Sequence, residues 1–186
     1  MHSLPAFAAL LLLTPTASPG PLAIGQKLQP FAELASLQGR KAFVLAFIAT
    51  ECPVSNAYNA RMAAFAKEYA AKGVAFVGIN SNRHETRDRV VQHAKQNGLD
   101  FLVLKDEGNA KADQLGAQVA PEVYVFDAGW TLRYRGRIDE DRSGSSVPSA
   151  DLGAAVDALL EGREIRLKET KAFGCTIKRV PGREAR

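Results

Sequence analysis

The sequence predicts an α/β domain with a central mixed β-sheet flanked by helices. Two continuous apolar runs, at residues 42–48 and 74–79, are typical of strands buried on both faces. Helical patterns follow both runs, and two further strands joined by a tight turn lie late in the chain. Alternating strands and helices imply parallel strands with crossover helices, whereas the late hairpin implies an antiparallel edge. A chain of 186 residues is long enough to bury the core of one such domain.

The first 20 residues have the pattern of a signal peptide. An apolar stretch at residues 4–13 is followed by small and turn-forming residues, and it is too short to span a bilayer comfortably. We therefore expect cleavage near residues 17–20 and an exported protein of the bacterial periplasm. A disordered apolar N-terminus is the alternative. Extracytoplasmic compartments permit disulfides, which bears on the two cysteines of the chain.

The predicted elements follow in order along the first half of the domain. After the strand at 42–48, large apolar residues recur at helical spacing from Tyr58 to Tyr69, in a helix that ends at Gly73. The strand at 74–79 comes next. It leads to a polar segment at residues 85–97, which we expect to be helical.

In the predicted helix at 85–97, we expect Val90, Val91 and Ala94 to face the core, and Gly98 to end the helix. A short strand at 101–104 and a short helix at 110–115, capped by Asn109, follow.

A hairpin and a closing helix complete the domain. Strands at 123–126 and 130–138 flank a turn, and the second strand alternates apolar residues with Arg133, Arg135 and Arg137. The closing helix covers 150–161, with Ser149 as its cap.

This element order is that of a thioredoxin-like fold with an N-terminal extension at 21–39 and one inserted βα unit. The domain then covers residues 21–162.

Residues 163–186 form a basic C-terminal extension that carries Cys175. The extension holds eight Lys or Arg and three Glu, a net +5, while the whole chain is +4. We expect a solvated extension; contact with an anionic membrane or partner is the alternative. No aromatic residues interleave with its basic residues in the way that nucleic-acid binding uses, so we expect no nucleic-acid partner.

Cys52 lies where the first strand hands over to a helix. Pro53 suits the first helical position, which makes Cys52 the predicted N-cap, with its sulfur facing free N–H groups. We expect the pKa of its thiol to lie below the reference value of roughly 8.5, which makes it reactive. Glu51 opposes this shift if its carboxylate is close. A buried, inert cysteine is the alternative.

Pro121 precedes the first strand of the hairpin. A cis peptide bond at Ala120–Pro121 would turn the backbone sharply and present it to the sulfur of Cys52. An ordinary trans proline at the start of an edge strand is the alternative.

Four stretches carry a resemblance to a known family. They are Thr-Glu-Cys-Pro at 50–53, Gly-Ile-Asn-Ser-Asn at 78–82, Tyr-Arg-Gly-Arg-Ile-Asp at 134–139 and Gly-Cys-Thr-Ile at 174–177. In this order and spacing, the chain resembles the peroxiredoxin-like redoxins of the thioredoxin superfamily, which are related to the alkyl hydroperoxide reductase/thiol-specific antioxidant group. The resemblance implies a thioredoxin fold, Cys52 as the reactive thiol and Pro121 as the cis-proline.

The chain departs from both parent motifs. Ser55 stands where a thioredoxin has the second cysteine of C-x-x-C. Peroxiredoxins have a Thr three residues and a Pro seven residues before the reactive cysteine, and here those positions hold Ala49 and Leu45. Thr50, one residue closer to Cys52, is our candidate for the catalytic threonine.

Cys175 is the one possible intramolecular partner of Cys52, because the chain has two cysteines. About 14 residues separate Cys175 from the closing helix, and at roughly 3.3 Å per residue their reach is not limiting. A structural or intermolecular role for Cys175 stays open beside its pairing with Cys52.

Polar residues at strand ends are candidates for substrate binding. Asn80 and Asn82 follow a predicted strand at the edge where open α/β sheets place their sites; a simple turn of the chain is the alternative. Glu51 adjoins Cys52, and Arg137, like Arg61, is a candidate to reach the sulfur. Arg135 and Arg137 are candidates to guide anionic substrates, with exposed arginines on a strand face as the alternative.

We expect no metal or cofactor. His84 and His93 lie nine residues apart, a spacing that matches no common copper-ligand motif.

Three functions follow from these residues. The first is thiol–disulfide exchange, in which the Cys52 thiolate attacks a disulfide and Cys175 resolves the product. The second is peroxide reduction, in which Cys52 becomes a sulfenic acid that condenses with Cys175 or an external thiol. The third is a non-catalytic module that binds partners. The partners implied by the first two are protein or small-molecule disulfides, or hydroperoxides, together with an external thiol reductant.

Overall fold

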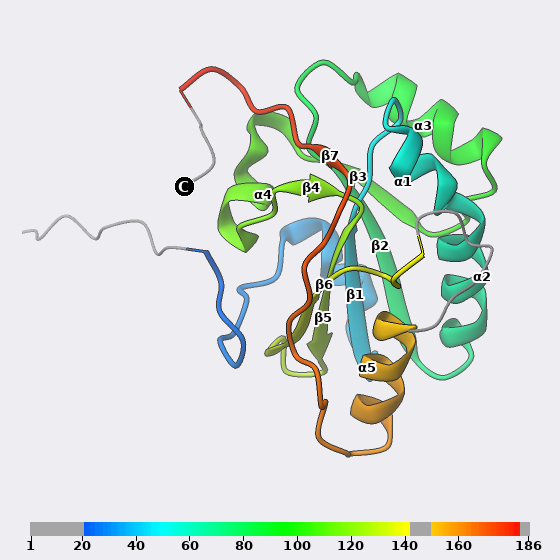
Figure 1. Cartoon of the computed structure of the whole chain (residues 1–186), viewed down its shortest axis with the longest axis vertical. Helices are drawn as coiled ribbons and strands as arrows, with labels where there is room; N and C mark the ends of the chain where they lie inside the picture. Colours follow the sequence, from blue (N-terminus) through cyan, green and yellow to red (C-terminus); the bar gives the residue numbers. More distant parts are fainter. Residues whose placement is uncertain (1–20, 142–149, 183–186) are drawn as a thin grey trace, which may run out of the picture.

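The computed structural model describes residues 21–141 and 150–182 (Figure 1). The predicted signal peptide at 1–20 and the predicted cap Ser149 lie outside these residues. None of the described helices is long and apolar enough to cross a bilayer.

The core of the molecule is a five-stranded mixed sheet in the order β3-β2-β1-β5-β6. Its strands are β1 (Ala42–Phe47), β2 (Val74–Asn80), β3 (Leu102–Lys105), β5 (Glu122–Asp127) and β6 (Leu132–Gly136). Strand β1 runs parallel to β2, and β2 runs parallel to β3, while β5 is antiparallel to both β1 and β6. The predicted mixed sheet is therefore confirmed.

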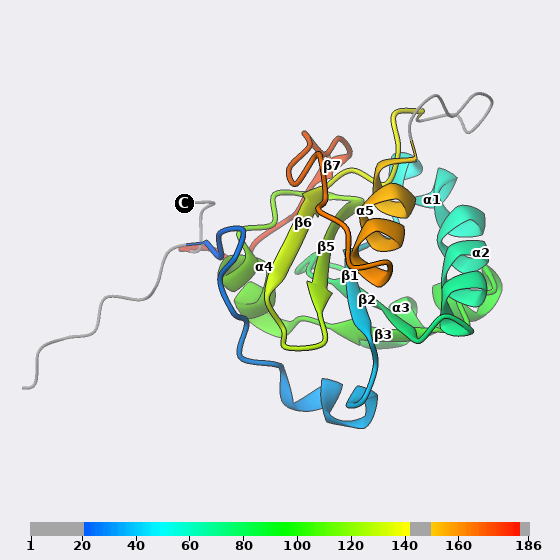
Figure 2. The same ribbon diagram turned by 90° about the horizontal axis from the view of Figure 1, so that it is seen from below.

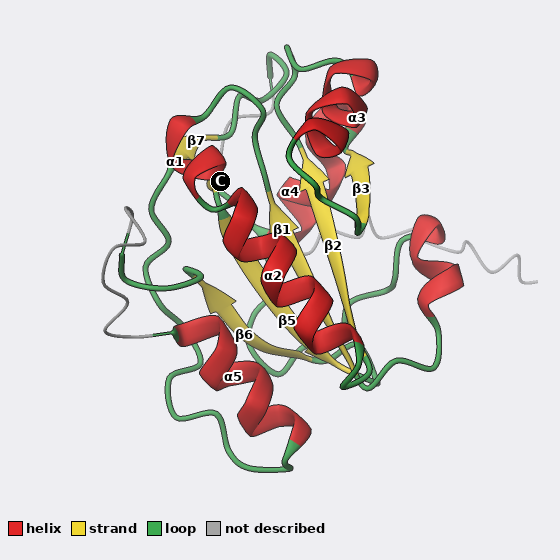
Figure 3. Ribbon diagram, turned by 90° about the vertical axis from the view of Figure 1, so that its right-hand side faces the viewer, coloured by secondary structure: helices red, strands yellow, loops and turns green. Residues whose placement is uncertain are grey.

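Helices cover both faces of this sheet. They are α1 (Pro53–Ala57), α2 (Asn59–Ala70), α3 (Arg87–Gln96), α4 (Ala110–Leu115) and α5 (Asp151–Leu160), with short 3-10 helices η1 (Ala32–Leu37) and η2 (Glu107–Asn109). Helices α2 and α5 pack side by side on one face (Figure 3). The N-terminal segment and α4 lie on the opposite side (Figure 2).

Strand β1 contributes to both layers of the core. Val44 and Ala46 point into the layer beneath α2 and α5, whereas Phe43, Leu45 and Phe47 point into the layer beneath α4. Because all six residues of β1 are buried, the strand reads as a continuous apolar run instead of an alternating one.

The inserted unit consists of β3 and α4. It stands between α3 and β5 in the chain and adds β3 to the edge of the sheet beside β2. The N-terminal extension packs against the sheet on the side of α4, where Leu28 and Leu34 are buried.

Two local expectations were wrong. Val91 is 61% exposed, because neighbouring residues of α3 point in different directions and the helix turns Val90 to the core, as expected for Val90. Asn109 adopts a left-handed conformation (φ 63°) and does not cap α4 with its side chain. Asp106 accepts the N–H groups of Lys111 and Ala112 in its place, at 3.0 Å each.

The C-terminal segment at 163–182 packs on the domain, which corrects the expectation of a solvated extension. It follows α5, passes β6 and reaches the edge near α1 as the orange-to-red chain of Figure 1. There β7 (Cys175–Thr176) pairs antiparallel with β4 (Val119–Ala120). Ile177 is buried in the layer beneath α4, and the Arg179 guanidinium bonds Asp113 of α4 at 3.0 Å. These apolar and charged contacts hold the segment against the domain.

Candidate functional site: a cysteine pair at the start of α1

The two cysteines of the chain form a disulfide bond. Cys52 and Cys175 are 123 residues apart in sequence, and their Cα atoms lie 5.9 Å apart. This separation is within the range that a disulfide requires. The structure therefore shows Cys175 paired with Cys52, which is one of the roles that the sequence left open for it.

Cys52 is the N-cap of α1, and Pro53 occupies the first helical position. The backbone N–H of Ser55 donates to the Cys52 sulfur at 3.3 Å. When the disulfide is reduced, the same N–H and the positive end of the first helical turn favour a thiolate. Cys52 is only 3% exposed, so this stabilised sulfur is screened from solvent.

The peptide bond at Ala120–Pro121 is cis, as the resemblance implies. The Ala120 carbonyl oxygen lies 3.5 Å from the Cys52 sulfur, and Ala120 faces Cys175 in the β4–β7 pair. The cis-proline segment thus borders both cysteines.

Gly174 allows β7 to approach this segment. A Cβ atom on residue 174 would lie 2.1 Å from the Ala120 carbonyl oxygen, well inside the contact distance of real side chains. No larger residue fits there without displacing the backbone of β7 or of β4.

Ser55, at the position of a thioredoxin's second cysteine, has a local structural contact. Its side chain is fully buried, and its hydroxyl accepts the backbone N–H of Ala49 at 3.0 Å. This bond joins the end of β1 to the first turn of α1, on either side of Cys52.

Glu85 is a part of the site that sequence reasoning missed. The residue is 1% exposed, and its carboxylate accepts the backbone N–H groups of Thr50 at 2.8 Å and Glu51 at 3.2 Å. The sequence predicts Glu85 as the first residue of an exposed helix, so no signal in the chain indicated a buried role. Because α3 starts two residues later, Glu85 turns instead toward the loop before Cys52.

Two asparagine side chains complete the bonding of this carboxylate. Asn80 and Asn82 both donate their amide N–H groups to Glu85, the latter at 3.0 Å. The Asn82 amide oxygen accepts the backbone N–H of Lys178 at 2.8 Å. One chain of hydrogen bonds therefore links the loop before Cys52 to the segment after Cys175.

The hydrogen bonds keep this buried group ionised. Burial raises the pKa of the Glu85 carboxyl, but the donors on Thr50, Asn80 and Glu51 outweigh it and hold the pKa below its usual range. Lys105, whose ammonium donates to the Asn82 carbonyl oxygen at 2.7 Å, has a pKa lowered by burial.

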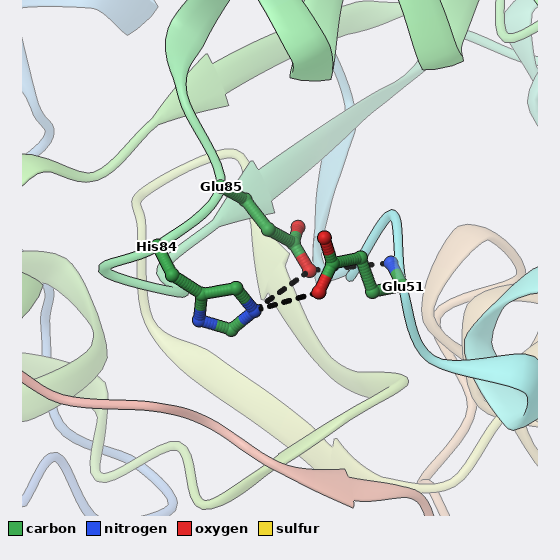
Figure 4. A group of neighbouring side chains, drawn as sticks. All are labelled: Glu51, His84 and Glu85. Atoms are coloured by element: carbon green, nitrogen blue, oxygen red, sulfur yellow. Dashed lines mark hydrogen bonds and ion pairs between the residues drawn. The ribbon is translucent and has the colours of Figure 1, made fainter.

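The side chains of Glu51, which precedes Cys52 in the chain, His84 and Glu85 come together (Figure 4). The His84 Nε2 atom lies 3.0 Å from a Glu51 oxygen and 4.0 Å from a Glu85 oxygen, and one ligand-type atom of each residue lies within 4.8 Å of the others. These groups are of a kind that binds divalent cations. However, each Glu85 oxygen already accepts two N–H groups, and the Arg89 guanidinium pairs with Glu51.

The remaining predicted residues have contacts elsewhere. The Arg137 guanidinium bonds Asp151 and Glu140, both at 2.6 Å. Arg61 pairs with Asp139 at 2.7 Å.

His93 does not join His84 in a site. Its Nε2 atom lies 3.2 Å from the Asn59 amide nitrogen on α2, and burial lowers the pKa of its imidazole.

The fold and the site define a class of protein: a thioredoxin-fold chain in which a cysteine at a helix N-terminus pairs with a second cysteine beside a cis-proline. The family model described as "AhpC/TSA family" matches residues 25–135. Because this match covers more than half of the chain, the protein belongs to the AhpC/TSA family.

Solved structures are similar over most of the chain. A hypothetical protein from Sinorhizobium meliloti is 35% identical with a TM-score of 0.75, covering 90% of this chain and 97% of that one. An uncharacterized conserved protein from Geobacillus kaustophilus is 33% identical with a TM-score of 0.74, covering 81% and 83%. A putative thioredoxin from Neisseria meningitidis is 20% identical with a TM-score of 0.57, covering 68% and 79%, and shows the shared fold.

One curated relative is a thiol:disulfide interchange protein, DsbE, of Vibrio cholerae. It is 30% identical over 115 residues, which make up 59% of this chain and 59% of that protein. The chain therefore spans about three fifths of the length of this relative.

Proposed function

We propose that the protein is a thiol–disulfide oxidoreductase whose exchanging groups are Cys52 and Cys175. The observation that carries this proposal is the disulfide between them, formed at a helix N-terminus beside a cis-proline. The similarity to a thiol:disulfide interchange protein supports the same reaction.

The reaction proceeds by two thiolate attacks. In the reduced protein, one cysteine thiolate attacks a partner disulfide, forms a mixed disulfide and releases one partner thiolate. The second cysteine then attacks the protein sulfur of the mixed disulfide, which forms the Cys52–Cys175 bond and releases the other partner thiolate. Two electrons pass from the protein to the partner, and an external thiol reductant returns them.

The polar residues around the pair position its loops. The Glu85 carboxylate accepts the backbone N–H groups of Thr50 and Glu51. In our proposal these two residues therefore have a structural role, which is to hold the loop just before Cys52. Asn80 and Asn82 are almost fully buried and bonded to Glu85, which favours positioning over contact with substrate.

Peroxide reduction is the second candidate, favoured by the AhpC/TSA match. The Cys52 thiolate would attack the peroxide O–O bond and become a sulfenic acid, which condenses with Cys175 and releases water. Ala49 and Leu45 replace the family's Thr and Pro, and Arg61 and Arg137 are committed to carboxylates. These residues favour disulfide exchange as the first function.

A direct comparison of oxidants tests the two candidates. The reduced protein is mixed separately with oxidised glutathione and with hydrogen peroxide, and formation of the Cys52–Cys175 bond is followed by mass spectrometry. We expect faster oxidation by the disulfide. Faster oxidation by peroxide would select the second candidate, and no oxidation by either would indicate a non-catalytic module.

Export remains part of this proposal and rests on the pattern of residues 1–20 and on the disulfide. Cell fractionation and N-terminal sequencing of the mature chain test it, and we expect cleavage near residues 17–20. A chain recovered from the cytoplasm with residue 1 intact would contradict export.

A further inference from the structure

The two sulfurs of the disulfide differ in their access to solvent. Cys52 is 3% exposed and packs against Ala49 and Ala120, with Val54 at the edge of the cluster. Cys175 is partly exposed, and both its chain neighbours, Gly174 and Thr176, are exposed. An incoming thiol therefore meets Cys175 first.

The two sulfurs also differ as leaving groups. When a thiolate attacks one sulfur of a disulfide, the other departs with the electron pair, and the sulfur that best stabilises a thiolate leaves faster. Cys52 accepts the Ser55 N–H and caps α1, so its thiolate is the better stabilised of the two. Cys175 lies in the short strand β7, and none of the described residues donates a hydrogen bond to its sulfur.

We propose that Cys175, and not the helix-capping Cys52, is the cysteine that exchanges with external thiols. This inference rests on the proposed function and assigns the order of its steps. The incoming thiolate attacks the Cys175 sulfur, the Cys52–Cys175 bond breaks, and Cys52 leaves as a thiolate. The product is a mixed disulfide on Cys175.

A second thiol completes the reduction. It attacks the incoming thiol's sulfur in the mixed disulfide, forms a small disulfide with it and releases Cys175 as a thiolate that takes up a proton. By microscopic reversibility, oxidation by the same small disulfide begins with Cys175. The Cys52 thiolate then attacks the Cys175 sulfur of the mixed disulfide, forms the Cys52–Cys175 bond and releases the small thiol as a thiolate. The order is opposite to that expected from a helix-capping cysteine in a C-x-x-C pair, because here a strand covers the cap.

Anchoring of the strand supports this assignment. After Cys175 the chain is held by the burial of Ile177 and by the ion pair between Arg179 and Asp113. Between them, the Lys178 backbone N–H donates to the Asn82 side chain, and the Lys178 carbonyl accepts the Arg83 backbone N–H. The strand therefore keeps its cover over Cys52 when one sulfur is modified.

Peptide mapping identifies the attacked sulfur. The oxidised protein is mixed with glutathione, quenched with acid at successive short times, alkylated with N-ethylmaleimide and digested. We expect glutathione on Cys175 and the maleimide on Cys52, in severalfold excess when extrapolated to zero time. The opposite pattern, with glutathione on Cys52, would overturn this inference and leave thiol–disulfide exchange intact. If neither cysteine reacts with glutathione or dithiothreitol in the folded protein, exchange itself fails and this inference fails with it.

Two matched single-cysteine variants provide an independent measurement. Cys52→Ser leaves the thiol of residue 175, and Cys175→Ser leaves that of residue 52. At about pH 9.5, where ordinary thiols are mostly ionised, we expect oxidised glutathione to modify the Cys52→Ser variant faster. Circular dichroism confirms that both variants are folded. Faster modification of the Cys175→Ser variant would overturn the assignment.

Discussion

Glu85 is a buried carboxylate that forms no salt bridge with a Lys or Arg among the described residues. Four N–H donors, two from the backbone and two from amide side chains, compensate for its loss of water. The side chain at this position must accept hydrogen bonds at both of its terminal atoms. A glutamine is close in size but places an NH2 group against N–H donors.

We expect Glu85→Gln to lower the free energy of unfolding by about 1–3 kcal/mol, the usual consequence of leaving buried donors unsatisfied. Urea denaturation of the oxidised protein at pH 7 measures the change. Glu164→Gln serves as the control, because Glu164 is exposed and its one ion pair within the described part of the chain is with Lys168. Equal stability of the two variants would contradict the role of the Glu85 carboxylate.

The pH dependence of stability follows from the same group. The folded pKa of Glu85 lies below the value of the unfolded chain, so its contribution is fully present above about pH 4.5 and is lost as the pH falls through the lower, folded pKa. We therefore expect the difference in stability between the native protein and Glu85→Gln to shrink as the solution is acidified below pH 4.5. Urea titrations across this window test the prediction, and a difference that grows there would refute it.

Ser55 offers a test of the helix-cap geometry. We expect Ser55→Cys in a Cys175→Ser background to form a disulfide between residues 52 and 55, because the Ser55 N–H already lies 3.3 Å from the Cys52 sulfur. Loss of the bond to the Ala49 N–H should destabilise this variant by about 1 kcal/mol. Mass spectrometry of the unreduced chain detects the bond. Two free thiols after treatment with oxidised glutathione would contradict the prediction.

At the scale of elements, the short β4–β7 pair brings the C-terminal segment to the start of α1. Gly174 permits its close approach to the Ala120 carbonyl. Gly153, in α5, has room for a methyl group, since a Cβ there would meet its nearest atom at 3.6 Å.

We expect Gly174→Ala to displace β7 and slow formation of the Cys52–Cys175 bond severalfold during oxidation by glutathione disulfide, since a Cβ would overlap the Ala120 carbonyl. Gly153→Ala should leave this rate unchanged and stabilise α5 by about 0.5–1 kcal/mol. Quenched-flow alkylation and thermal unfolding provide the two readouts. Unchanged bond formation in Gly174→Ala would show that the close contact is not required.

The elements that sequence analysis predicted well are those with a strong period or a long apolar run. Strands β1 and β2 are buried on both faces and so carry uninterrupted apolar residues. Strands β4 and β7 have two residues each, too few for any period to show. Their pairing joins Ala120 to Cys175 across 55 residues of chain, and it needs the close approach that Gly174 allows.

The candidate site divides in the same way. Cys52 and Pro53 have a local signal, because capping and the first helical position are decided by adjacent residues. Glu85 has none, because its partners Thr50 and Asn80 belong to other elements and meet it only in the folded chain. Val91 was misplaced because adjacent residues of a helix point roughly 100° apart, and α3 turns Val90 to the core.

At the scale of the whole molecule, the disulfide joins the first helix to the C-terminal segment across 123 residues. We expect its reduction to lower the free energy of unfolding by about 2–5 kcal/mol, because the cross-link restricts the unfolded chain. Urea denaturation with and without dithiothreitol measures this difference. A double variant, Cys52→Ser with Cys175→Ser, should not respond to the reductant. Equal stability of the oxidised and fully reduced native protein would contradict the prediction.

The contacts that hold residues 177–180 act on the reduced protein as well. Ile177, Arg179 and Val180 are fixed to the layer beneath α4 by burial, by Asp113 and by Asn109 respectively. Reduction therefore leaves the Cys175 thiol on a tether two residues long, however long the loop that separates it from Cys52. Its effective concentration at Cys52 is set by this tether, and a monothiol in solution must compete with it. The pair consequently behaves as a chelating dithiol, which favours ring closure and donation of electrons to partners.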